Sequence, residues 1–168
     1  EGSFGSLFFP SPGRKGARGL KVWLVKMEEK LPIDVSYRPY RNGMLADALV
    51  ERGHDVTFWA SDYDYFSKKF RYGSRKTIQF NDQLKLELLH VGHKFGSTVS
   101  AMRLIDNALL AREFARAAKE SKAPDMIVCS MPTPSLAAES AKLCEELGIP
   151  LVVDCRDYWP EIIRDELG

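Results

Sequence analysis

Residues 126–154, MIVCSMPTPSLAAESAKLCEELGIPLVVD, decide the fold class of this chain. The apolar runs at 126–129 and 151–153 are continuous, which is typical of strands covered on both faces of a sheet. The segment 134–147 between them has residues typical of helix ends on both sides, so we expect it to be a helix. A strand, a helix and a second strand in this order predict a right-handed crossover between parallel strands.

The ends of this helix are marked by three residues. Thr133 is the expected N-cap, Pro134 suits the first helical position, and Gly148 supplies the stop. Upstream, the same kinds of signal predict further strands and helices. The strands are expected at 20–25, 55–60 and 84–88, and the helices at 40–52 and 99–121.

The order β-α-β-β-α-β-α-β predicts an α/β fold, with a Rossmann-like open, mostly parallel sheet and helices on both faces. The stretch LKLEL at 84–88 alternates with period two, so we expect a half-exposed edge strand there. In the helix at 99–121, we expect Met102, Ile105 and Leu109 to face the core.

Composition limits the possible classes of protein. The 168 residues suit one domain, and 24 Lys and Arg against 23 Asp and Glu give no overall attraction for nucleic acid or anionic membrane. Cys129, Cys144 and Cys155 form no paired framework, which indicates a reducing, cytoplasmic compartment and no metal site. Residues 1–19 are expected to be a flexible arm or a cloning remnant, leaving 20–168 as the domain.

In such a sheet, ligands bind at the carboxyl ends of the strands. The loop after the first strand ends in Arg38, Arg41, Asn42 and Gly43, at a helix N-terminus that favours an anion such as a diphosphate. The alternative is that both arginines are solvated surface charges. No G-x-G-x-x-G or P-loop motif follows the strand, which argues against a dehydrogenase or an ATPase.

Two other loops reach the same edge. One carries Ser130 and Thr133, and the other carries Asp154, Arg156 and Asp157. Asp157 could orient or deprotonate a substrate hydroxyl, and Arg156 could stabilise charge on a leaving phosphate. The alternative is an ion pair that only holds the loop in place.

The stretch FSKKFRYGSRK at 66–76 interleaves basic and aromatic residues. Lys68, Lys69 and Arg71 are candidates for contact with an anionic membrane surface, and a solvated basic loop is the alternative. Nucleic acid is a poorer partner, because no nucleic-acid-binding motif accompanies this stretch.

Three stretches carry a family resemblance: YRPYRNGMLADALVERGHDVTFWASDYDYF, PDMIVCSMPTPSLAAESAKL and GIPLVVDCRDYWPEI. Together they resemble the N-terminal domain of GT-B glycosyltransferases of family four, in the subgroup that builds bacterial surface polysaccharides. The likeness covers 20–168, and DCRDYWPE is its most specific part. Arg156 falls where many members have a histidine, and Asn42-Gly43 stands where many have a diglycine near the donor phosphate.

The resemblance implies a retaining transferase, without metal or cofactor, that moves a sugar from a nucleotide-sugar to a glycan or lipid-linked acceptor. It implies that this chain is the acceptor-side half, and that a C-terminal donor domain is absent and needed for turnover. A cytoplasmic enzyme, peripheral at the inner membrane face, would fit. Two rivals remain: a GT-B-fold sugar-nucleotide epimerase, and a non-catalytic module that binds a membrane surface or a carbohydrate.

Overall fold

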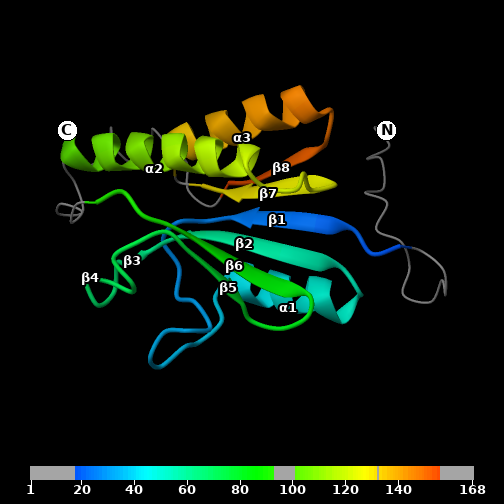
Figure 1. Cartoon of the computed structure of the whole chain (residues 1–168), viewed down its shortest axis with the longest axis horizontal. Coiled ribbons are helices and arrows are strands. Elements are labelled where there is room, and N and C mark those ends of the chain that lie inside the picture. Colours follow the sequence, from blue (N-terminus) through cyan, green and yellow to red (C-terminus); the bar gives the residue numbers. More distant parts are fainter. Residues whose placement is uncertain (1–17, 93–100, 132, 156–168) are drawn as a thin grey trace, which may run out of the picture.

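The computed structural model describes residues 18–92, 101–131 and 133–155, with the backbone alone for 101–104. Most of the expected N-terminal arm, residues 1–17, thus lies outside the description. The described residues form a six-stranded sheet, a small two-stranded sheet and three helices (Figure 1). In chain order the elements are β1 (Lys21–Val25), α1 (Arg41–Glu51), β2 (Asp55–Ser61), β3 (Tyr63–Asp64), β4 (Lys69–Phe70), β5 (Lys76–Gln79), β6 (Leu84–Leu89), α2 (Ala101–Lys119), β7 (Met126–Ser130), α3 (Pro134–Leu147) and β8 (Leu151–Asp154).

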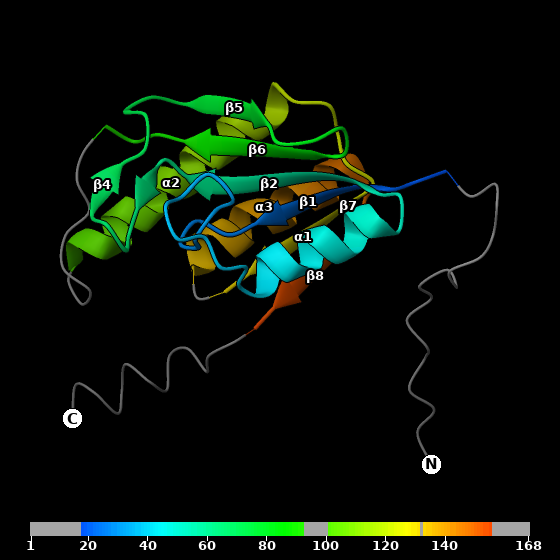
Figure 2. The same ribbon diagram turned by 90° about the horizontal axis from the view of Figure 1, so that it is seen from below.

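The strand order in the main sheet is β5-β6-β2-β1-β7-β8. All neighbouring strands run parallel except β5, which pairs antiparallel with β6. Helix α1 covers one face of the sheet, and α2 and α3 cover the other (Figures 1 and 2). The predicted Rossmann-like open, mostly parallel sheet with helices on both faces is confirmed.

The sheet separates two hydrophobic cores. Alternate residues of β1 point to opposite faces, so Trp23 belongs to the core under α2 and α3, while Leu24 belongs to the core under α1. In the first core, Trp59 makes edge-on contacts with Trp23 and with Phe114 of α2, at centroid distances of 4.9 and 5.3 Å. These aromatic contacts fix α2 over the central strands.

The prediction that 84–88 forms a half-exposed edge strand is wrong. Strand β6 lies between β2 and β5, and Glu87 is buried. Glu87 is tolerated there because it accepts a hydrogen bond from Thr77 Oγ1 at 2.8 Å and pairs with Lys85 at 3.0 Å. Neighbouring polar partners, and not solvent, explain the alternation of this strand.

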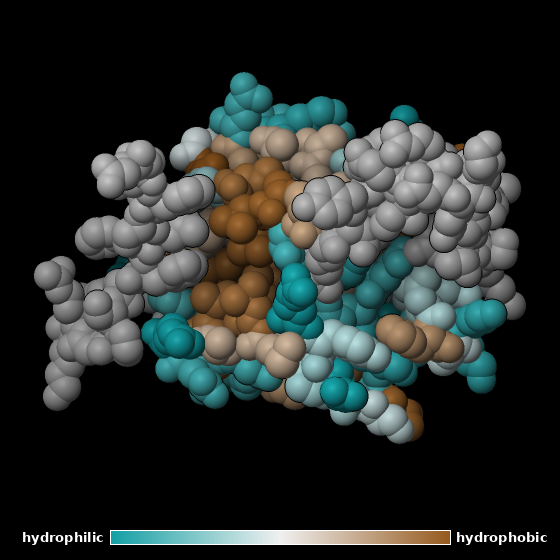
Figure 3. Space-filling model, turned by 180° about the vertical axis from the view of Figure 1, so that it is seen from behind, coloured by the Kyte–Doolittle hydropathy of each residue, from teal (hydrophilic) through white to brown (hydrophobic). Residues whose placement is uncertain are grey.

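The prediction that residues 151–153 form a strand covered on both faces of the sheet is also wrong. Strand β8 is the edge of the described sheet, and Val152 and Val153 are 40% and 41% exposed. In the view from behind, apolar side chains gather in a hollow between hydrophilic margins (Figure 3). An edge position explains this exposure, because β8 has a described neighbour on one side alone.

Helix α2 covers the sheet as expected, but with a different side. Ile105 is exposed, whereas Leu110, Phe114 and Ala117 are fully buried. The expected inward face through Ile105 is therefore wrong. Met102 belongs to the part of the helix for which the backbone alone is described.

Candidate functional site

The candidate site lies at the carboxyl ends of β1, β7 and β8. Strand β1 stands between β2 and β7, so the chain leaves it toward one side of the sheet and later returns on the other. The carboxyl ends of β1 and β7 thus flank the switch point where open α/β sheets bind ligands. The loop at 26–40, which follows β1, leads directly into the N-terminus of α1.

Glu29 places its carboxylate at the N-terminus of α1. Its Oε1 accepts the backbone N–H groups of Asn42 and Gly43, each at 3.0 Å, and its Oε2 accepts Asn42 Nδ2 at 2.7 Å. Glu29 is only 4% exposed, and the N-cap residue Tyr40 makes no capping hydrogen bond with its side chain. The protein therefore supplies its own anion where a diphosphate was predicted to bind.

Gly43 suits the same local packing. A Cβ at this position would lie 2.6 Å from Tyr37 Oη and 3.3 Å from Pro39 Cβ, so a larger residue would require the Tyr37 side chain to move. Burial, and then the negative charges of Asp47 and Glu29, raise the pKa of the Tyr37 phenol above its ordinary value. Tyr37 therefore stays neutral and can donate a hydrogen bond near neutral pH.

A chain of polar contacts joins α1, β7 and β8. Ser130 Oγ lies 3.0 Å from Asn42 Oδ1 and 3.4 Å from Asp154 Oδ2, and its single proton can serve one of them at a time. Arg41 Nη1 lies 3.2 Å from Asp154 Oδ1. The fold thus brings together the predicted residues Arg41, Asn42, Gly43, Ser130 and Asp154. Such a set can bind hydroxyl groups through the carboxylate and an anion through the guanidinium.

Four other predicted residues lie apart from these contacts or outside the description. Arg38 is exposed on the 26–40 loop. Thr133 is buried at the start of α3, where its carbonyl accepts two helix N–H groups and its side chain makes no capping bond. Arg156 and Asp157 lie outside the described residues.

Sequence reasoning missed Lys26 and Glu29. Both are buried directly after β1, and Lys26 Nζ lies 3.3 Å from the carbonyl of Met131. The available signal was KMEEK at 26–30, in which charges follow an apolar strand without a turn residue. Charges in that position require partners, and the carboxyl edge of the sheet is where partners converge.

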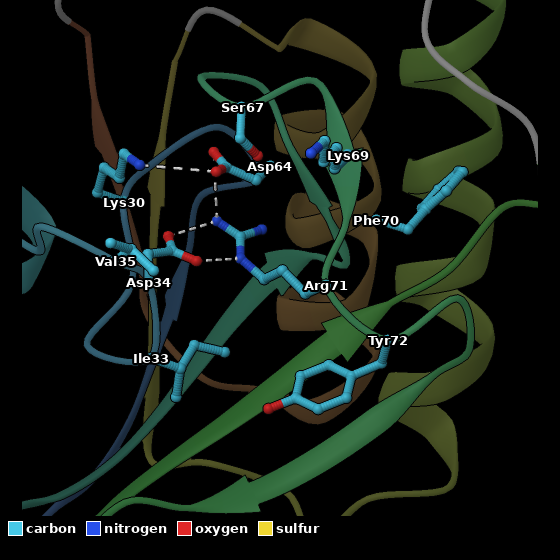
Figure 4. A pocket seen from close by; sticks show the side chains of 10 residues that line it. All are labelled: Lys30, Ile33, Asp34, Val35, Asp64, Ser67, Lys69, Phe70, Arg71 and Tyr72. Carbon is cyan, nitrogen blue, oxygen red and sulfur yellow. Dashed lines mark hydrogen bonds and ion pairs between the residues drawn. The ribbon is translucent and has the colours of Figure 1, made fainter.

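A cavity of about 410 Å³ opens beside the site, between the 26–40 loop and the β3–β4 hairpin (Figure 4). Lys30 and Asp34 line it from the loop, and Asp64, Arg71 and Tyr72 line it from the hairpin segment. No local sequence pattern indicates this cavity, because its two walls are far apart in the chain.

Arg71 ties the two walls together. Its Nε and Nη2 bind the two carboxylate oxygens of Asp34 at 2.6 and 2.7 Å, and its Nη1 donates to the carbonyl of Ser61 at 2.8 Å. The Arg71 side chain is 8% exposed, so the prediction that it contacts a membrane surface is corrected. Lys68 and Lys69, its companions in that prediction, are exposed.

Asp62 and Asp64 hold the hairpin from below. Asp62 is fully buried. Its Oδ1 accepts a hydrogen bond from the Tyr72 N–H and its Oδ2 accepts one from the Gly73 N–H, each at 2.9 Å. His90 Nδ1 also lies 3.0 Å from Oδ2. Burial opposes ionisation of Asp64, but a hydrogen bond from Ser67, the Phe66 N–H and two nearby cations lower the pKa of the Asp64 carboxyl below its ordinary value. Asp64 is therefore ionised near neutral pH, and hydrogen bonds and ion pairs to both carboxyl groups anchor the hairpin.

The described residues lack two features, a metal-binding cluster and a membrane-spanning helix. No group of three or more His, Cys, Asp or Glu among them is arranged to hold a metal ion. None of the helices described combines the length and the apolar character needed to span a membrane.

Comparisons with known proteins give a likeness of fold. No protein-family model and no curated protein matches the chain. Among solved structures, the glycotransferase of kitacinnamycin matches with a TM-score of 0.50 and 18% identity, over 90% of this chain and 34% of that one. The C-terminal domain of a hydrogenase from Pyrococcus furiosus matches with a TM-score of 0.47 and 14% identity, over 82% and 93%. This chain therefore spans about a third of the glycotransferase, with which it shares a fold.

Proposed function

We propose that this chain is the acceptor-side half of a retaining glycosyltransferase, which moves a sugar from a nucleotide-sugar to a glycan or lipid-linked acceptor in surface polysaccharide synthesis. The observation that carries this function is the cluster of Arg41, Asn42, Ser130 and Asp154 at the switch point of the sheet. The glycosyltransferase-like fold supports it, as does the DCRDYWPE stretch that follows β7 and α3 in the chain.

In this function the chain's own side chains position the acceptor and the departing phosphate. Asp154, held by Arg41 and Ser130, accepts a hydrogen bond from an acceptor hydroxyl. Asp157 orients or deprotonates the attacking hydroxyl, and Arg156 stabilises the charge that develops on the leaving diphosphate. No metal or cofactor is needed for these roles, and the nucleotide-sugar is a substrate.

Arginine side chains, and not the helix amides, are the proposed phosphate contacts on this half. Glu29 already uses the N–H groups of Asn42 and Gly43. Arg38 is exposed, and Arg41 keeps donors beyond the one that faces Asp154. We therefore propose that the donor phosphate lies near Arg38, Arg41, Asn42 and Gly43. Of these, the two arginines alone would contact it directly.

Turnover is proposed to need a second domain that carries the nucleotide site. The decisive experiment joins this chain to its natural C-terminal continuation and measures sugar transfer from a panel of nucleotide-sugars. We expect the joined protein to transfer sugar. Asp154→Asn should greatly reduce the rate of transfer, whereas the control Lys142→Ala, on the exposed side of α3, should leave that rate unchanged. Absence of transfer with every donor and acceptor, or full activity of the Asp154→Asn variant, would contradict this function.

Product analysis separates the transferase from its enzymatic rival. A sugar-nucleotide epimerase would convert the donor without any acceptor, whereas the proposed enzyme forms a glycosidic bond. A non-catalytic module would bind its ligand and leave every nucleotide-sugar unchanged.

A further inference from the structure

Exposed apolar and aromatic side chains surround the mouth of the cavity between the 26–40 loop and the β3–β4 hairpin. Val35 is 88% exposed and Phe66 is 54% exposed, and Tyr40 and Tyr72 are also exposed. Tyr40 and Phe66 stack with their ring centroids 5.9 Å apart, so the two loops present one continuous surface. Single exposed apolar residues are ordinary, but a cluster from two segments indicates an interaction surface.

Positive charge is concentrated in two stretches that overlap these segments, although the 26–40 loop as a whole contains three basic and three acidic residues. Residues 35–46 and 65–76 contain no Asp or Glu, but they contain two and five basic residues, respectively. Three of these are neutralised by carboxylates elsewhere in the chain: Arg41 by Asp154, Arg71 by Asp34 and Arg75 by Glu120. The others form no ion pair with a described residue: Arg38, Lys68, Lys69 and Lys76.

Lysine and aromatic groups alternate around the mouth. Lys30 Nζ lies 5.3 Å from the centre of the Phe66 ring, and Lys76 Nζ lies 5.8 Å from the centre of the Tyr72 ring. Lys68 occupies the turn between β3 and β4 with a φ of 56°, and Lys69 follows it on the exposed hairpin. This arrangement places ammonium groups beside apolar side chains at the outermost part of two loops.

We propose that this surface docks the protein on an anionic lipid bilayer. Aromatic rings and Val35 would enter the headgroup region, where amphipathic rings are favoured, and the unpaired lysines would face the lipid phosphates. The Phe66 ring is already engaged by Tyr40 and Lys30, which favours shallow burial of the surface over stacking on a nucleic-acid base. This docking surface goes beyond the proposed function and does not depend on it, since no nucleotide-sugar takes part.

The test is sedimentation of the full chain with vesicles of phosphatidylcholine alone or mixed with phosphatidylglycerol. We expect binding to the mixed vesicles alone, weakened by 0.5 M salt (about three times physiological ionic strength). The double variant Lys68→Ala/Lys69→Ala should bind roughly 25-fold more weakly, about fivefold for each lysine. Phe66→Ser should also weaken binding, and it leaves the net charge unchanged.

The matched control is Lys119→Ala/Lys142→Ala, which removes the same charge from α2 and α3 on the opposite face of the sheet (Figure 1). It should bind as the unmodified chain does. The docking surface is refuted if the unmodified chain fails to bind the mixed vesicles, or if the control loses as much binding as the Lys68→Ala/Lys69→Ala variant. Thermal unfolding of each variant shows that the comparison is made between folded proteins.

Discussion

Arg71 shows how a single residue can hold two distant segments together. Its guanidinium binds Asp34 with two hydrogen bonds and lies 3.8 Å from Asp64, and all three side chains are at most 8% exposed. Removing one partner of a buried ion pair leaves the other charge uncompensated. We expect Arg71→Ala to lower the free energy of unfolding by about 3–5 kcal/mol in urea titrations.

The neighbouring Lys68 is the matched control for Arg71, because it is an exposed base on the same hairpin. Lys68→Ala should change the free energy of unfolding by no more than about 0.5 kcal/mol. Equal losses for the two variants would show that the Asp34–Arg71 pair does not stabilise the hairpin.

Asp64 should make stability depend on pH in the acidic range. Its pKa is lowered in the folded protein, so its stabilising contribution is fully present above the unfolded-state pKa of about 4 and is lost as the pH falls through the lower, folded-state pKa. The difference in unfolding free energy between the unmodified chain and Asp64→Asn should therefore shrink below about pH 4. A difference that is constant from pH 6 to pH 3 would contradict this.

The three cysteines should differ in reactivity. Burial raises the pKa of the Cys129 thiol to about 11 and also raises that of Cys144, whereas Cys155 is exposed. At pH 8 roughly 0.1% of a thiol with that pKa is thiolate. Iodoacetamide should therefore modify one thiol quickly in the native protein, and Cys155→Ser should abolish the fast reaction. Fast labelling that persists in Cys155→Ser would show that a buried thiol reacts.

At the scale of elements, the sequence predicted whether each long segment is a helix or a strand better than it predicted which strands are neighbours in the sheet. The bounds expected for β1, β2, β7 and α3 lie within one residue of those observed. The edge of the sheet was misplaced, because the KTIQ stretch of β5 is too short and polar to reveal that it covers β6. Strand neighbours depend on pairing across the chain, which local periodicity does not contain.

Helix α2 offers a direct test of which side faces the core. Leu110 is fully buried and Ile105 is exposed on the same helix. Leu110→Ala should lower the free energy of unfolding by about 2–5 kcal/mol, because it leaves a cavity. Ile105→Ala should cost less than about 0.5 kcal/mol, because alanine has the higher helix propensity. A larger loss for Ile105→Ala would mean that the helix is rotated.

At the scale of the whole molecule, both faces of the central strands are covered, and each of these strands is paired on both sides. Strands β1, β2 and β7 satisfy both conditions, whereas β5 and β8 are edges of the described sheet. We expect hydrogen–deuterium exchange to be slowest in β1 and β2 and fastest in β5 and β8. Slower exchange at β8 than at β1 would contradict the strand order.

The general position of the candidate site could be predicted because strand order alone places the ends of parallel strands at one edge. Arg41, Ser130 and Asp154 were found in this way. Glu29 and Arg71 were not, because their roles depend on partners 13 and 37 residues away, at Asn42 and Asp34. Loop conformations decide such contacts, and no local pattern specifies them.

The carboxylate of Glu29 is an intramolecular competitor of any soluble anion for the N–H groups of Asn42 and Gly43. It is attached to the same chain as the amides it binds, so its effective concentration is on the order of millimolar or higher, and it never diffuses away. A phosphate must outcompete it or bind elsewhere. Mobility of the segment that carries Glu29 therefore sets how readily the N-terminus of α1 opens to a visiting ligand.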